Sequence, residues 1–154
     1  LHDALPIWKD VPYGNGGSVV AIARDKSGKE VARHRIETAG KAVALRIEAE
    51  TPTDWKADGM DLQYINVTVI DKKGRPVWDY NEPLTLQMEG AARLVALDNG
   101  DHYTDELFHG ITSKRMYQGR MQIILRSDQE AGNVTVKISS AGLKGTLRLK
   151  TIKE

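Results

Sequence analysis

The chain has 154 residues, with 22 Lys and Arg against 21 Asp and Glu, a net charge of +1 and no Cys. The balanced charge excludes a basic surface of the kind that binds nucleic acid or anionic membranes, and the lack of Cys excludes disulfides, thiolate zinc sites and cysteine nucleophiles. No apolar run approaches the roughly 20 residues of a membrane-spanning helix, and no signal-peptide pattern opens the chain. We expect one ordinary domain, or one domain with part of another, and neither a nucleic-acid nor a membrane partner.

The beginning of the chain differs in character from the rest. The first seven residues, LHDALPI, resemble translated sequencing-adapter tails, so we predict that residues 1–7 are a non-native tail. After a short extended piece at residues 8–13 and a glycine-rich break, two β-prone runs flank a short turn and predict a hairpin of Ser18–Arg24 and Glu30–Glu37. Because a lone hairpin is marginally stable in water, we expect residues 8–40 to be the last strands of a preceding β-sandwich domain.

From a small, polar boundary at residues 38–41 onward, the pattern predicts strands only. The expected strands are 43–49, 62–70, 84–89, 93–97, 112–117, 121–126, 133–140 and 146–152. Alternation of apolar and polar residues predicts which side chains point inward. These are Val43, Leu45, Ile47, Ile65, Val67, Val69, Val134, Val136 and Ile138. Seven or more short strands, separated by turns at intervals near the roughly 8–12 residues usual for such folds, indicate an all-β fold, an immunoglobulin-like antiparallel β-sandwich over residues 42–154.

The predicted strand 93–97 runs directly into the sequence Asp98, Asn99, Gly100 and Asp101, which we interpret as a structural turn. Asp and Asn side chains accept hydrogen bonds from nearby amides, and Gly adopts a positive φ without steric cost. The oxygens of this corner, with those of Asp105 and Glu106, raise the alternative of calcium. A calcium loop needs about six to eight converging oxygens at a set spacing. The spacing here does not match, so the corner predicts side-chain capping and no metal site.

A second candidate site is the loop sequence Trp78, Asp79, Tyr80 and Asn81, with Trp55 and Tyr103 as further aromatic candidates. Flat aromatic rings stack on the CH faces of a pyranose, while carboxylates and amides bond its hydroxyls, so these four residues are candidates for carbohydrate contact. Packing within the sandwich or against a neighbouring domain is the favoured alternative. The four histidines show no zinc-like spacing and no nucleophile elbow occurs, so we assign no catalytic residue, metal or cofactor.

Taken in order, the strand and turn motifs resemble a known region. The segments WKDVPY, VVAIARDKSGKEVARHRIETAGKAVALRIEAE, ADGMDLQYINVTVIDKKGRPV, DNGD, YQGRMQIILRS and EAGNVTVKISSAGL resemble the C-terminal region of bacterial β-galactosidases of glycoside hydrolase family two. Residues 42–154 are similar to the last accessory sandwich of the longer members, a domain that also resembles the immunoglobulin-like repeats of invasin- and intimin-type adhesins. Residues 8–40 are similar to the end of the sandwich before it.

The resemblance implies a non-catalytic accessory domain. The family's reaction uses two carboxylates about 5 Å apart at the strand ends of a barrel of about 250 residues. This chain has no room for that barrel and no Glu that matches the catalytic motifs, so the implied partners are the barrel and the preceding sandwich of the parent chain. The resemblance also favours a periplasmic or extracellular location. Two alternatives remain: a carbohydrate-binding module with Trp78 and Tyr80 as its platform, and an adhesin-like repeat that binds a protein.

Overall fold

The structure is a computed structural model that describes residues 9–10 and 16–153. The chain divides into two compact units, Leu1–Ala39 and Gly40–Glu154. The extended piece expected at residues 8–13 lies outside the described residues except for residues 9 and 10. No residue that the structure describes is helical, and no helix capable of crossing a membrane occurs among them.

The first unit contains an antiparallel hairpin of β1 (Ser18–Arg24) and β2 (Glu30–Glu37), as the sequence predicts. The Asp25 carboxylate shapes its turn by accepting hydrogen bonds from the amides of Ser27 (2.8 Å) and Lys29 (3.0 Å). Gly28 takes a φ of 83° there, a conformation that glycine adopts without strain. Val31 and Ile36 are exposed on this hairpin, so it buries little apolar surface of its own.

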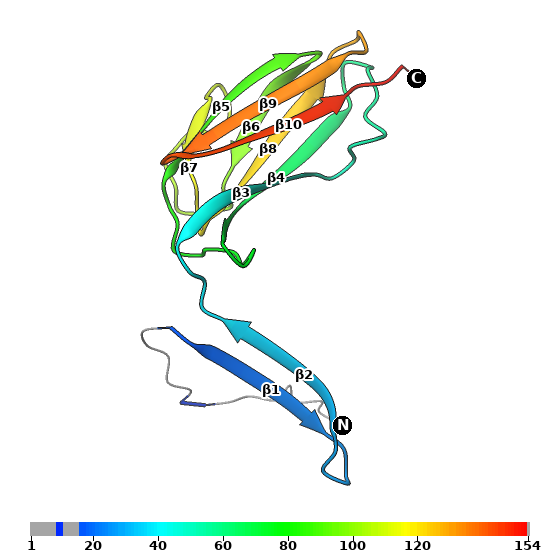
Figure 1. The fold of residues 1–154 in the computed structure, drawn as a ribbon. Coiled ribbons are helices and arrows are strands. Elements are labelled where there is room, and N and C mark those ends of the chain that lie inside the picture. Colours follow the sequence, from blue (N-terminus) through cyan, green and yellow to red (C-terminus); the bar gives the residue numbers. More distant parts are fainter. Residues whose placement is uncertain (1–8, 11–15, 154) are drawn as a thin grey trace. The chain divides into compact units, whose positions relative to one another are not determined.

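The second unit is a sandwich of two four-stranded antiparallel sheets (Figure 1). One sheet has the order β10-β9-β5-β7 and the other the order β3-β4-β8-β6. The strands are β3 (Ala42–Ala49), β4 (Leu62–Asp71), β5 (Pro83–Gly90), β6 (Ala92–Asp98), β7 (Ser113–Arg115), β8 (Arg120–Ser127), β9 (Asn133–Ser140) and β10 (Leu143–Lys150). Every pair of neighbouring strands is antiparallel, which confirms the predicted fold class.

The core lies between the facing sides of the two sheets. Along β4, β8 and β9 its fully buried side chains alternate with more exposed residues, as a pleated strand requires. The buried aliphatic side chains of the core include Ile65, Val67, Val69, Leu84, Leu97, Ile123, Leu125, Val134 and Val136. The inward positions predicted on β4 and β9 are therefore confirmed.

The structure corrects three details of the strand predictions. Val43 is 50% exposed instead of buried, because the pairing of β3 with β4 shifts register between Ala42 and Ala44 and turns Val43 outward. The strand expected at 112–117 pairs only over Ser113–Arg115, since the chain turns back at Gln118 and Gly119, which both have positive φ. The closing strand begins at Leu143 and ends at Lys150, earlier than the predicted 146–152.

The early start of β10 has a local cause. Ala141 and Gly142 have φ values of 42° and 88°, and they form a two-residue connection between β9 and β10. Positive φ at both central residues gives the turn a twist that matches the twist of the flanking strands, so pairing resumes directly at Leu143. Beyond β10, Ile152 pairs in parallel with Lys56.

The registers define which loops share an end of the sandwich. Ala42 at the start of β3 pairs with Asp71 at the end of β4, and Thr68 pairs with Arg120 at the start of β8. The same end holds the beginning of β5, since Pro83 pairs with the last residue of β7. We refer to this end, where β3 begins, as the proximal end. The opposite end, where β4 begins, is the distal end.

Candidate functional site

Two polar side chains shape the corner at the end of β6. The Asp98 carboxylate accepts a hydrogen bond from the Gly100 amide (2.8 Å), and the Asn99 Oδ1 atom accepts one from the Asp101 amide (3.1 Å). Asn99 is buried, and its Nδ2 atom donates to the carbonyl of Arg115 at 2.9 Å. The corner is therefore bonded to the last residue of β7, 16 positions further along the chain.

A buried lysine fixes the loop that continues from this corner, residues 99–112, which we refer to as the corner loop. Lys114 is only 2% exposed, and its Nζ atom donates to the carbonyls of Glu106 and Leu107, both at 3.1 Å. The ammonium group also lies 4.2 Å from the centre of the Phe108 ring, a cation–π contact. A buried charge is costly unless it is paired and hydrogen-bonded, so these partners explain how Lys114 is accommodated and why the loop holds its shape.

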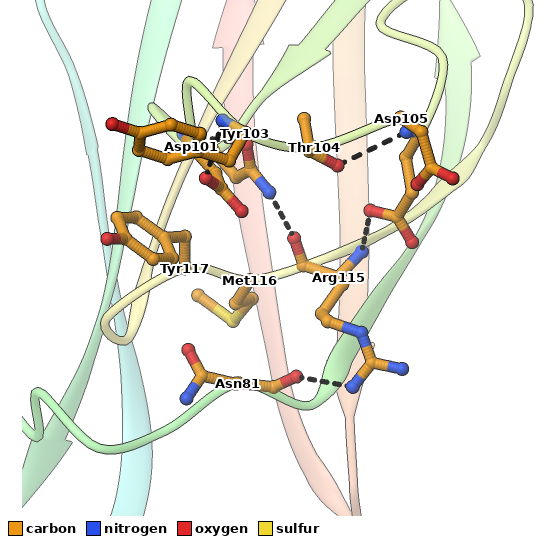
Figure 2. Close-up of a pocket in the computed structure, with 10 residues that line it drawn as sticks. Asn81, Asp101, Tyr103, Thr104, Asp105, Arg115, Met116 and Tyr117 are labelled. Carbon is orange, nitrogen blue, oxygen red and sulfur yellow. Dashed lines mark hydrogen bonds between the residues drawn. The ribbon is translucent and has the colours of Figure 1, made fainter.

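The corner loop, the loop before β5 and the end of β7 with the two residues after it enclose an open hollow of about 570 Å³ at the proximal end (Figure 2). Its lining consists of Asn81, Asn99, Asp101, Tyr103, Thr104, Asp105, Glu106, Arg115, Met116 and Tyr117. Arg115 joins two of the walls, because its amide donates to Glu106 Oε2 (3.2 Å) and its Nη1 atom donates to the carbonyl of Asn81 (3.2 Å). Polar groups and two tyrosines thus line the hollow, which is suited to a polar ligand with flat apolar faces.

Of the four predicted carbohydrate-contact residues, only Asn81 lines this hollow, and its Oδ1 atom accepts a hydrogen bond from the Gln118 amide (3.0 Å). Trp78 is half exposed, and the guanidinium of Arg120 lies 4.3 Å from the centre of its ring. Asp79 is exposed. The Tyr80 hydroxyl is 2.8 Å from the hydroxyl of Ser140, which directs it toward the sandwich. Trp78 and Tyr80 do not join the corner residues in one cavity.

The other two aromatic candidates have opposite environments. Trp55 is 1% exposed at the distal end, where its Nε1 atom donates to the carbonyl of Asp61 (3.1 Å), so it belongs to the core and not to a binding surface. Tyr103 is 97% exposed on the corner loop. The oxygens of the corner do not gather into a metal site: among the described residues, no group of three or more acidic or histidine side chains is arranged to hold a metal ion.

Sequence reasoning missed several residues of the site region, among them Lys114, Arg115 and Tyr117. Lys114 could have been found, because the strand pattern that points Met116 inward points the residue two positions before it to the same side. Arg115 and Tyr117 carry no such signal, since they reach the hollow only through the long-range pairing of β7 with β5.

A buried carboxylate fixes the point where the chain reaches the proximal end. Asp71 is 3% exposed and accepts hydrogen bonds from the amides of Gly40 (2.8 Å), Lys73 (2.8 Å) and Arg75 (2.9 Å), and from Arg75 Nε (2.7 Å). These donors, the Gly40 amide first, hold the pKa of Asp71 well below its usual value, against the opposing effect of burial. Gly40 is thereby tied to the end of β4.

Comparison with known proteins identifies the family to which this β-sandwich belongs. Residues 45–147 match the family described as glycoside hydrolase family 2 C-terminal domain 5. The β-galactosidase BoGH2A of Bacteroides ovatus is 32% identical over 128 residues, which are 83% of this chain and 15% of that protein. The chain therefore spans a small part of the length of this relative.

Solved structures agree with the sequence match. A glycosyl hydrolase family 2 member from Bacteroides cellulosilyticus superposes with a TM-score of 0.85 and 28% identity, over 93% of this chain and 18% of that one. The D00-D0 domain of intimin matches 92% of this chain and 66% of its own with a TM-score of 0.51 and 19% identity, a likeness of fold alone. The chain belongs to the C-terminal domains of glycoside hydrolase family 2, in the group described as domain 5.

Proposed function

We propose that this C-terminal accessory domain is non-catalytic and that it packs by its proximal end against the preceding domains of a β-galactosidase-like parent enzyme. The observation that carries this proposal is the set of exposed apolar side chains on the proximal loops outside the hollow. Trp78 is 49% exposed, Leu107 62% and Phe108 40%. Large apolar side chains left exposed on the loops of one end are candidates for contact with another protein surface.

The topology supports the choice of this end. The chain reaches the sandwich at the proximal end, where Gly40 is bonded to Asp71. Residues that precede Gly40 are therefore joined to the sandwich at the end that carries the loops of Trp78 and Leu107. Because the chain is a small fraction of its relatives, 15% of BoGH2A, most of such a parent lies in other domains that this end can contact.

The parent's activity is part of the same proposal. A β-galactosidase-like enzyme of this family hydrolyses its substrate with two carboxylates on a barrel, and no residue of the present chain takes part. The accessory domain contributes by packing, which buries apolar surface and stabilises the assembled enzyme. An adhesin-like role is the rival, and it rests on a likeness of fold to intimin.

Hydrogen exchange tests the packing. Amide exchange is compared between the 154-residue chain and the complete parent enzyme, residue segment by residue segment. We expect the part of the corner loop around Leu107 and Phe108 and the loop around Trp78 to exchange more slowly in the parent, and the distal loop around Met60, which is 76% exposed, to exchange equally in both. Equal exchange of the proximal loops in the two proteins would contradict the proposal.

A matched pair of substitutions measures how much the proposed packing contributes to the stability of the parent enzyme. Leu107→Ser should destabilise the parent by roughly 1.5–3 kcal/mol, the value of burying one leucine side chain, and should leave the stability of the isolated chain nearly unchanged. Met60→Ser at the distal end serves as the control and should change neither. If both variants affect the parent equally, the proximal end is not the packing surface.

A further inference from the structure

The two tyrosines of the hollow differ from the other exposed aromatic residues in their surroundings. Tyr103 is 97% exposed and Tyr117 37% exposed, and both line a cavity whose other lining residues are polar except for Met116. Figure 2 shows both rings projecting toward the same side of the hollow. Flat rings beside hydrogen-bonding groups are the combination that binds a pyranose, whose CH faces stack on aromatic rings. We infer that the hollow is a binding subsite for a neutral pyranose sugar.

The polar groups needed for sugar hydroxyls lie next to the tyrosines. Asp101 Oδ1 accepts a hydrogen bond from the Tyr103 amide at 3.0 Å, and within the described part of the chain no group donates to its Oδ2 atom. Thr104 Oγ1 accepts from the Glu106 amide at 3.2 Å and keeps its own hydroxyl proton for donation. Asp105 is exposed at the rim. Acceptors and a donor are therefore available beside the stacking surface.

The site is held in shape before a ligand arrives. Lys114 fixes the loop from inside through the carbonyls of Glu106 and Leu107, and Asn99 bonds the corner to the carbonyl of Arg115. Tyrosine itself loses little conformational freedom on binding, because its side chain has only about two rotatable bonds. A preorganised loop lowers the entropic cost of binding, which matters most for a small ligand such as a sugar.

The charge of the lining determines which sugars the hollow can bind. The lining contains the carboxylates of Asp101, Asp105 and Glu106 and the guanidinium of Arg115, which already donates to Asn81. The buried Lys114 ammonium lies 3.9 Å from Glu106 Oε2, so three carboxylates still face only two cations. Like charges brought together at a binding surface weaken association. The hollow therefore favours neutral pyranosides and disfavours uronic acids, whose carboxylate would meet the acidic wall.

An NMR titration of the 154-residue chain tests this inference. The probes are β-1,4-galactobiose and cellobiose as neutral sugars and methyl β-glucuronide as a charged sugar, and the choice of a galactoside rests on the proposed function. We expect amide shifts at Asp101, Tyr103 and Tyr117 with a neutral probe, and binding of the glucuronide weaker by at least about tenfold, the effect of one unfavourable charge contact.

Variants identify the groups responsible. Tyr103→Ala should weaken binding of the neutral probe by roughly tenfold without changing the melting temperature, since the ring is exposed, whereas Trp78→Ala, an aromatic deletion outside the hollow, should leave affinity unchanged. Asp101→Asn keeps an acceptor for the Tyr103 amide. It should reduce the difference in affinity between the neutral probe and the glucuronide.

Two results would overturn the inference. The first is no amide shift with either neutral probe at about 20 mM, a concentration that saturates a site with a Kd of about 1 mM. The second is an affinity of the Tyr103→Ala variant equal to that of the wild type. Binding of cellobiose without galactobiose supports a sugar site in the hollow and argues against a galactoside as its ligand. These results come from the isolated chain, so they are independent of the packing experiment on the parent.

Discussion

Trp55 should be the residue whose loss most disturbs the distal end of the sandwich. Its side chain is 1% exposed, and its Nε1 atom donates to the carbonyl of Asp61. Its backbone carbonyl accepts from the Ile152 amide (2.9 Å), and the neighbouring Ala57 amide donates to the Ile152 carbonyl (2.8 Å). The indole thus fills the distal end while its backbone secures the C-terminal segment.

The expected magnitudes follow from this environment. Trp55→Ala removes a buried ring and leaves a cavity, a change that costs about 3–5 kcal/mol in other proteins. Trp55→Phe keeps most of the apolar volume and loses one hydrogen bond. The Asp61 carbonyl still accepts from the Ser127 amide (3.0 Å) in that variant, so the expected cost is only about 1–2 kcal/mol. Comparing the stability losses of the two variants separates the contribution of the buried ring volume from that of the hydrogen bond.

Urea denaturation followed by circular dichroism measures both variants, with the stability change taken from the shift in midpoint at constant slope. Trp78→Ala is the matched control, because that indole is half exposed, and its cost should stay below about 1 kcal/mol. A cost below about 1 kcal/mol for Trp55→Ala, or equal costs for the two Trp→Ala variants, would refute the assignment of Trp55 to the core.

Three further predictions concern the backbone, the buried carboxylate and the first unit. Gly90→Ala should prevent normal folding, because Gly90 has a φ of 111° and an added Cβ would lie 1.9 Å from the Asn133 carbonyl oxygen. Expression level and melting temperature measure the effect, and an unchanged melting temperature would contradict the close approach. The folded state depresses the pKa of Asp71, so its contribution to stability is complete above the unfolded carboxyl pKa of about 3.9 and is lost as the pH falls through the lower folded value. Asp71→Asn should therefore be less stable than the wild type at pH 7 and show a weaker loss of stability on acidification, and parallel pH profiles would count against this. Amides of β1 and β2 should exchange much faster than those of β4 and β9, and equal protection would show that the hairpin is as stably held as the sandwich.

Alternation along the chain was enough to predict most strands. The bounds of β1, β2 and β9 agree with the prediction, because in these strands a period of two is flanked by clear turn residues. The prediction that Val43 points inward was wrong, because a register shift is a property of the strand pair and does not alter the alternation within one strand. The shortened β7 has a similar cause, since its end depends on its pairing with β5.

The candidate site was harder to predict than the fold. The hollow brings together residues from three separate stretches, around Asn81, along the corner loop and from the end of β7 to Tyr117, and no periodicity relates them. The burial of Trp55 was also invisible, because it lies in a loop where alternation does not apply. Composition alone identified the aromatic residues, but only the tertiary contacts distinguish the buried Trp55 from the exposed Tyr103.

The most direct test of the central claim is to determine the complete reading frame upstream of Leu1 in the source DNA. The proposed function predicts that the same frame encodes a catalytic barrel with two carboxylates, followed by a β-sandwich domain that the hairpin of β1 and β2 completes. Tandem copies of the Gly40–Glu154 sandwich, with no barrel, would contradict it and would favour an adhesin-like repeat.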